Sequence, residues 1–152
     1  MTERKSLALV QIESMWEKDK VITDDKLIDF NRSIPDLHGR YHEIYNTECI
    51  NRRKLEKEKN KLYMALKRYY GGISTREELT ALGRAPWAYN KPLKSEMHEY
   101  IDSDTSWCEL EDKLAMSEIK LKYLESILQT INRSSFIVKT QLDLIKFRDG
   151  EY

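Results

Sequence analysis

The chain concentrates cationic side chains in one segment that also carries tyrosines. Residues 51–72 read NRRKLEKEKNKLYMALKRYYGG and contain eight Lys or Arg side chains against two Glu. Single-stranded nucleic acid is bound by this mixture of residue types, because cations follow the phosphates and aromatic rings stack on the bases. The segment therefore predicts sequence-independent binding of a single strand. The alternative interpretation is a charged helix face that contacts only solvent.

The residues that we predict to contact nucleic acid form two groups. The first group surrounds the end of the segment, and the second lies nearer its start. The first group is Lys61, Lys67, Arg68, Tyr69 and Tyr70, and the second is Arg52, Arg53, Lys54 and Lys57. Stacking is worth about 1–3 kcal/mol per base, so a few rings and cations give useful affinity when an oligomer repeats them.

Other residue pairs that could do chemistry fit structural roles better. His38 and His42 would share a helix face, but no carboxylate completes a zinc motif such as HExxH. Asp102 and Asp104 precede an expected helix start, where acidic side chains stabilise the helix dipole. The sequence contains no nucleophile elbow, triad order or phosphate-binding glycine loop. We therefore expect no metal, no cofactor and no enzymatic activity.

The composition favours long amphipathic helices. The 152 residues are 40% hydrophobic and 34% charged, with five Gly and three Pro, a balance typical of an all-α protein. No apolar run reaches the roughly 18 residues of a membrane span, and the N-terminus lacks a signal-peptide pattern. We expect an intracellular protein with no membrane partner.

The net charge of zero conceals segments of opposite sign. Residues 1–50 sum to −3, residues 51–72 to +6, residues 73–112 to −5 and residues 113–152 to +2. The neutral total argues against a protein that binds nucleic acid on every side. The +6 segment is where an electrostatic site is expected.

Apolar spacing predicts three helices before the glycine pair at 71–72. We expect one at about 6–17, a second from about 24 to 33 that ends before Pro35, and a long basic helix at 36–70. Its seam includes polar residues such as Glu48, so we expect partly solvated middle turns. The glycine pair should end this helix.

Two shorter segments follow the basic helix. A capping box formed by Ser74 and Glu77 predicts a short helix at 74–82. Residues 83–92 contain two prolines and one glycine, which predict an ordered loop anchored by Trp87 and Tyr89.

The last third of the chain has the most regular pattern. A capping box of Ser106 and Glu109 begins an expected helix at 106–149, and ten of twelve seam positions between Trp107 and Ile145 are apolar. A second apolar stripe widens this face and favours a homo-oligomer. Its members are Met116, Ile119, Tyr123, Ile127, Ile137 and Leu144. The residues assigned to assembly are Leu121, Leu124, Leu128, Ile131, Val138 and Leu142.

The predicted organisation therefore has two regions. Residues 1–105 form a helical region that binds the single strand, and residues 106–149 form a C-terminal oligomerisation helix with a coiled-coil pattern.

Six segments occur in an order and at separations that resemble one phage family. They are WEKD at 16–19, PDLH at 35–38 with Tyr41, the basic helix ending in YYGG at 69–72, STREELTALGRAPW at 74–87, KSEMHEYIDSD at 94–104 and NRSSFIVKTQLDLIKFRDG at 132–150. The chain resembles the UvsY family of recombination mediator proteins of tailed bacteriophages over nearly its whole length.

The resemblance implies an all-helical homo-oligomer, a hexamer or heptamer ring, that binds single-stranded DNA without sequence preference. It implies two protein partners, a RecA-like phage recombinase and the phage single-strand-binding protein. The implied role is to load the recombinase in place of the binding protein during homologous recombination and repair, in the cytoplasm of the infected bacterial host. The alternative function is a coiled-coil scaffold or virion assembly protein without a nucleic-acid role.

One pair of positions departs from the family pattern. The family has Lys-x-Lys/Arg-x-x-Tyr-Tyr-x-Gly, whose two cations are associated with DNA binding, and here Met64 and Leu66 hold those positions. Lys61 and Arg68 are seven residues apart and return to within about 20° of one helix face. We therefore expect a basic strip that is rotated relative to that of the family.

Overall fold

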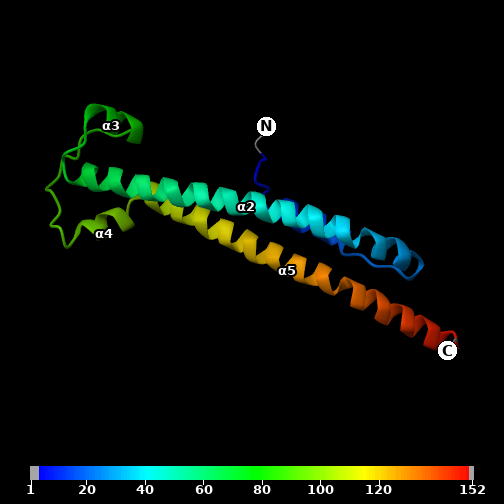
Figure 1. Ribbon diagram of the computed structural model, residues 1–152. Coiled ribbons are helices and arrows are strands. Elements are labelled where there is room, and N and C mark those ends of the chain that lie inside the picture. Colours follow the sequence, from blue (N-terminus) through cyan, green and yellow to red (C-terminus); the bar gives the residue numbers. More distant parts are fainter. Residues whose placement is uncertain (1–3, 151–152) are drawn as a thin grey trace. The chain divides into compact units, whose positions relative to one another are not determined.

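The computed structural model describes residues 4–150, and this part of the chain contains helices but no strand (Figure 1). The all-α prediction is thereby confirmed. In chain order the elements are α1 (Leu9–Asp19), the 3-10 turn η1 (Asp24–Lys26), α2 (Leu27–Tyr70), α3 (Arg76–Leu82), α4 (Met97–Asp102) and α5 (Thr105–Arg148).

Helix α2 continues through Pro35, which corrects the predicted break between two helices. A proline inside a helix removes one backbone hydrogen bond and costs roughly 3 kcal/mol. Ser33 Oγ donates to the carbonyl oxygen of Phe30 at 2.7 Å in the turn before the proline. Phe30 and Leu37, on either side of the proline, pack in one core. Their burial offsets the cost, since a fully buried large side chain contributes about 1.5–3 kcal/mol.

Two helices begin with a different cap from the predicted one. At α3, Thr75 Oγ1 accepts from the Glu78 backbone N–H at 3.2 Å, so Thr75 and not Ser74 is the N-cap. At α5, Asp104 Oδ1 accepts from the Ser106 backbone N–H at 2.9 Å. Asp104 therefore caps α5 in place of Ser106, because the cap must precede the first helical residue.

The predicted end of α2 at the glycine pair is confirmed. Gly72, after α2, has a φ of +70°, and Gly83 ends α3 in the same way with a φ of +67°. This left-handed conformation is common just beyond a helix and costs glycine little.

The helices contribute to two compact units, each with its own core. The first unit comprises Met1–Asn51 and Glu118–Tyr152, and the second comprises Arg52–Ser117. The first unit thus contains α1, the N-terminal part of α2 and the C-terminal part of α5.

The core of the first unit confirms the apolar pattern of the C-terminal helix. Its fully buried members come from α1, α2 and α5, and the rings of Trp16 and Tyr41 meet edge to face with centroids 5.5 Å apart. The members are Ile12, Leu37, Tyr41, Leu124, Ile127 and Ile131. Ile127 belongs to the second stripe, so the buried face of α5 is wider than a two-stranded seam.

Four of the six residues predicted for assembly are buried within the single chain. Leu121, Leu124, Ile131 and Val138 are buried, Leu128 is half-buried and Leu142 is exposed. The buried ones stabilise the fold of one chain, and their contact with a second copy stays a prediction.

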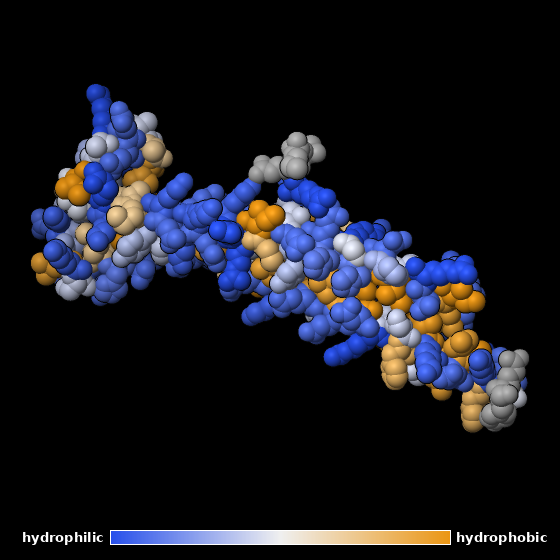
Figure 2. Space-filling model, viewed as in Figure 1, coloured by the Kyte–Doolittle hydropathy of each residue, from blue (hydrophilic) through white to orange (hydrophobic). Residues whose placement is uncertain are grey.

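A different face of the same helix carries exposed apolar side chains. Phe136, Ile137, Leu144 and Phe147 lie within an arc of about 100°, and all four are exposed. Figure 2 shows apolar surface toward the C-terminal end of the chain. We call these four residues the C-terminal apolar face.

A buried ion pair occupies the part of α2 that was expected to be solvated. Glu48 is only 2% exposed, and its carboxylate lies 3.0 Å from Lys120 Nζ on α5. The Ser6 hydroxyl donates to Glu48 and accepts from Lys120 Nζ. Asn51 Nδ2 donates to Glu48 Oε1 at 3.1 Å. The expectation of solvated turns is therefore wrong at Glu48, whose carboxylate is satisfied by the nearby Asn51 and by Ser6 and Lys120, which lie far away in the sequence.

Replacement of Lys120 by methionine should strongly destabilise the protein. Lys120→Met leaves the Glu48 carboxylate buried without its counter-charge, and loss of one partner of a buried pair costs about 3–5 kcal/mol. The measurement is the free energy of unfolding in urea at one fixed protein concentration. The control is Lys122→Met, at an exposed position of the same helix, and equal losses in the two variants would contradict the prediction.

Candidate nucleic-acid interface

Four cations project from one side of α2 in the second unit. Arg53, Lys57, Lys61 and Lys67 fall within an arc of about 120° at 100° per residue, along about 21 Å of helix. All four are exposed, and none forms an ion pair with a residue that the structure describes. We call them the basic strip.

The basic strip faces outward because the opposite side of α2 is buried. Leu66 is fully buried in the core of the second unit, and Leu62 packs against the same core. A cation at the position of Leu66 would lie in this core, whereas Met64 is exposed in the middle of the strip. The family pattern is therefore replaced here by cations on the outward face.

Two other predicted cations are engaged by carboxylates. Arg52 pairs with Glu56 at 3.3 Å. Arg68 Nε donates to Glu78 Oε2 at 2.8 Å, and Arg68 Nη2 donates to the Ile73 carbonyl oxygen at 3.2 Å. The hydrogen bond from Arg68 lowers the pKa of Glu78. These cations are less available to phosphate than those of the basic strip.

The two remaining cations of the segment are Lys54 and Lys59. Lys54 is exposed. Lys59, which we did not assign to DNA, lies 3.8 Å from Glu111 and 5.0 Å from the centre of the Trp107 ring. Lys59 is therefore held by partners on α5.

The two tyrosines predicted to contact DNA lie within an aromatic cluster. Tyr70 is 7% exposed, and Tyr69 is half-buried. The guanidinium carbon of Arg84 lies 5.0 Å from the centre of the Tyr69 ring, and the Trp87 ring lies 5.7 Å away from it. Both tyrosines already have partners within the protein, so their contact with DNA stays a prediction.

Asp104 organises this cluster through four hydrogen bonds. Its carboxylate accepts two from Arg84, at 2.6 and 2.7 Å, and one from the Tyr70 hydroxyl at 2.6 Å. The fourth comes from the backbone of Ser106. Burial raises the pKa of Asp104, but the hydrogen bonds from Arg84 and Tyr70 outweigh it, and the pKa lies below its ordinary value. Asp104 is therefore ionised at neutral pH, where its carboxylate accepts hydrogen bonds from Arg84 and Tyr70.

The same contact shifts the pKa of Tyr70 in the opposite direction, upward. Burial and then the hydrogen bond to Asp104 raise the pKa of Tyr70 to about 12, from an ordinary value of 10.0. The folded protein therefore favours the neutral phenol.

Tyr70→Phe should lower the free energy of unfolding at neutral pH by about 1–3 kcal/mol, because Asp104 loses a charge-assisted hydrogen bond. The folded-state pKa is the raised one, so this stabilisation is complete below pH 10 and is lost as the pH rises through about 12. Urea unfolding of both proteins between pH 7 and 12 should show their difference shrinking above pH 10.

Tyr89→Phe is the matched control, since that ring is 76% exposed. The control should leave the free energy of unfolding nearly unchanged across the range. A constant difference between Tyr70→Phe and the parent up to pH 12 would contradict the assignment.

An aromatic ring that we did not assign lies next to the basic strip. Tyr63 is 36% exposed and precedes Lys67 by four residues, about 40° around the helix. Its ring packs against Trp107 with centroids 5.7 Å apart, which fixes its position. The helical phase relative to Lys67 was the signal in the sequence that could have identified it.

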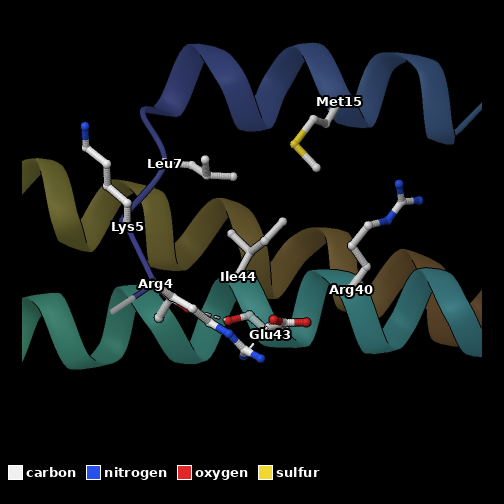
Figure 3. A pocket seen from close by; sticks show the side chains of 8 residues that line it. Arg4, Lys5, Leu7, Met15, Arg40, Glu43 and Ile44 are labelled. Carbon is white, nitrogen blue, oxygen red and sulfur yellow. Dashed lines mark hydrogen bonds and ion pairs between the residues drawn. The ribbon is translucent and has the colours of Figure 1, made fainter. Parts of the chain in front are cut away.

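A hollow in the first unit is a weaker candidate for binding phosphate. It measures about 380 Å³ and combines the cations Arg4, Lys5 and Arg40 with an apolar floor (Figure 3). Arg4 pairs with Glu43 at 2.6 Å, and Arg40 pairs with Asp19 at 3.2 Å. Two of the three cations are therefore already neutralised.

The described residues include no group of three or more His, Cys, Asp or Glu side chains that could hold a metal ion. The rings of His38 and His42 stack with centroids 5.7 Å apart. Within the same part of the chain, no helix is both long enough and apolar enough to cross a membrane.

Comparison with known proteins gives a family match and several similar structures. Residues 15–151 match the family model described as recombination, repair and ssDNA binding protein UvsY. No curated protein sequence matches the chain.

The similar structures are crystal forms of the bacteriophage T4 recombination mediator protein UvsY. Lattice type II has a TM-score of 0.78 at 19% identity, covering 94% of this chain and 98% of that chain. Lattice type I gives 0.77 at 19%, covering 91% and 98%. Lattice type IV gives 0.74 at 18%, covering 93% and 99%. At this level of identity the match establishes a shared fold.

Proposed function

Because the chain belongs to the UvsY family of recombination, repair and ssDNA-binding proteins, we propose that it is a recombination mediator that binds single-stranded DNA through the basic strip. The observation that carries the proposal is the strip itself. Arg53, Lys57, Lys61 and Lys67 are exposed on one helix face with no described ion-pair partner. Such cations can neutralise successive phosphates without reading bases.

In this proposal the basic strip contacts phosphates and the Tyr63 ring stacks on a base. Arg52 and Lys54 flank the strip and form a second tier of phosphate contacts. Arg68, Tyr69 and Tyr70 position the end of α2 through their contacts with Glu78, Arg84 and Asp104.

The biological role that we propose is to load a RecA-like recombinase onto DNA covered by the phage single-strand-binding protein. The protein would act without catalysis in the cytoplasm of the infected bacterial host. Family membership supports this role, and exposed cations support the DNA contact that it requires. The alternative function is that of a coiled-coil scaffold or virion assembly protein. The DNA-binding measurement below distinguishes it from the mediator role.

Removal of two cations from the strip should weaken DNA binding in a salt-dependent way. The slope of log affinity against log salt is negative, and each lost phosphate contact on a single strand reduces its magnitude by about 0.7. Lys61→Ala/Lys67→Ala should therefore make the slope shallower by about 1.4, measured by titration of labelled oligo(dT) at several salt concentrations.

The control for this experiment is Lys139→Ala, at an exposed position of α5 outside the strip. The control should keep the slope of the parent. Absence of binding by the parent at low salt would reject the DNA function and favour the scaffold.

Loss of the Tyr63 ring should weaken DNA binding without changing the salt slope. Tyr63→Leu removes one base stack worth about 1–3 kcal/mol, but a neutral ring releases no counterions. The control Tyr89→Leu removes an exposed ring that lies outside α2. If Tyr63→Leu binds oligo(dT) as tightly as the parent, base stacking on this ring is excluded.

We further propose that the protein is a homo-oligomer and that a second copy covers the C-terminal apolar face. Phe136 is 73% exposed and Leu144 is 58% exposed, and both belong to this face of α5. A contiguous exposed apolar patch commonly marks a protein–protein contact. A hexamer or heptamer ring would repeat the basic strip and raise the affinity for a long strand by avidity.

Polar substitutions on this face should reduce the native mass. Phe136→Ser/Leu144→Ser removes apolar contact area between copies but leaves the buried core residues of the chain in place. Analytical ultracentrifugation should show a smaller species than the parent. Val10→Ser, at an exposed apolar position of α1, is the control, and an unchanged mass in the double variant would refute the assignment of this face.

A further inference from the structure

A hollow walled by aromatic rings lies in the second unit and shares no residue with the basic strip. It measures about 320 Å³ and is lined by Tyr70, Trp87, Glu99, Tyr100 and Ser103. We call it the aromatic pocket. The ring centroids lie 4.8 Å apart for Tyr70 and Trp87, 5.7 Å for Tyr70 and Tyr100, and 6.3 Å for Trp87 and Tyr100.

The rings of the aromatic pocket are held in place by hydrogen bonds. The Tyr70 hydroxyl donates to Asp104 at 2.6 Å. The Trp87 indole Nε1–H donates to the carbonyl oxygen of Asn90 at 3.2 Å, so the loop itself orients this ring. A ligand would therefore meet two walls that are already in position, which reduces the entropy lost on binding.

The charge around the pocket is negative. Glu99 lies on its wall, and its carboxylate has no ion-pair partner among the described residues. Residues 73–112, which supply every wall except Tyr70, carry nine acidic and four basic side chains. The negative charge of Asp104, by contrast, is offset by Arg84.

We propose that the aromatic pocket binds a lysine or arginine side chain from a basic segment of a protein partner. A cation is attracted to the negative faces of Tyr and Trp rings, and Glu99 adds a direct counter-charge. The aliphatic stem of the same side chain would contact the ring surfaces. This site goes beyond the proposed DNA function, because it serves a different class of partner through different residues.

The geometry favours a cationic side chain over a nucleobase. The planes of Tyr70 and Trp87 meet at 79°, and those of Trp87 and Tyr100 meet at 86°. Rings at these angles form the corner of a box, whereas a flat base is held best against a parallel face. A base would also bring its phosphate toward Glu99, with which it has no favourable charge contact.

The test uses the full-length protein labelled with 5-fluorotryptophan and two capped peptides. The first is acetyl-Gly-Gly-Lys-Gly-Gly-amide, and the second has norleucine in place of lysine. Trp16, Trp87 and Trp107 give three fluorine resonances. The lysine peptide should shift the Trp87 resonance in a saturable way and leave Trp16 unchanged, and the norleucine peptide should shift neither.

Glu99→Gln removes the counter-charge at constant size and should raise the dissociation constant for the lysine peptide by about fivefold. The matched control is Glu96→Gln, an exposed carboxylate on the same segment that does not line the pocket. The control should stay within about twofold of the parent.

Four results would overturn the proposal. The first is the absence of a saturable shift at Trp87 with the lysine peptide. The second is an equal response to the norleucine peptide. The third is an equal loss of affinity in Glu96→Gln. The fourth is displacement of the lysine peptide by oligo(dT) with a tighter oligo(dT) complex in Glu99→Gln, which would make the pocket a base-binding site.

Discussion

The carboxylate of Asp104 is the contact on which the second unit depends. It joins three segments that are remote in sequence: the end of α2 through Tyr70, the loop after α3 through Arg84, and the start of α5 through its own cap. A buried carboxylate is unfavourable unless its oxygens are satisfied. Because all three segments must be in place to satisfy it, Asp104 also fixes the rotation of α2, and with it the outward direction of Lys67.

The first unit uses a buried charge for a related purpose. Glu48 and Lys120 pair at 3.0 Å where otherwise apolar faces of α2 and α5 meet. Such a pair adds little net stability, because desolvation of both charges opposes their attraction. Its larger effect is on register, since a shift of one residue rotates a side chain by about 100° around its helix. The apolar core residues Leu124, Ile127 and Ile131 could repack after such a shift. The same shift would leave Glu48 and Lys120 buried without their counter-charges, which costs more.

The pattern of the sequence was sufficient to predict α5 and the end of α2, but not the contacts that these helices make. The apolar period of α5 and the glycine pair after α2 are local signals, and the structure confirms them. The continuation of α2 through Pro35 depends on core contacts made by residues on both sides of the proline, and these are not local. The burial of Glu48 likewise depends on Lys120, which lies 72 positions further along the chain.

The candidate site shows the same division between local and distant causes. Periodicity gives the angle between two residues of one helix, so the proximity of Lys61 and Arg68 was predictable. Periodicity does not show which cations form ion pairs with carboxylates on other elements, as Arg68 does with Glu78 on α3. Nor does it show that Tyr70 turns inward toward Asp104 while Tyr63 stays partly exposed.

The two sites that we propose on the second unit would respond differently to salt. Contacts between the basic strip and phosphates are exposed and weaken steeply as counterions compete. A cation enclosed by Tyr70, Trp87 and Tyr100 is partly desolvated, so its attraction to the rings is screened much less. The +6 charge of residues 51–72 and the −5 charge of residues 73–112 therefore do more than cancel. If both proposals hold, these charges would allow one small unit to bind an anionic strand and a cationic protein segment together, and to release the strand first as the ionic strength rises.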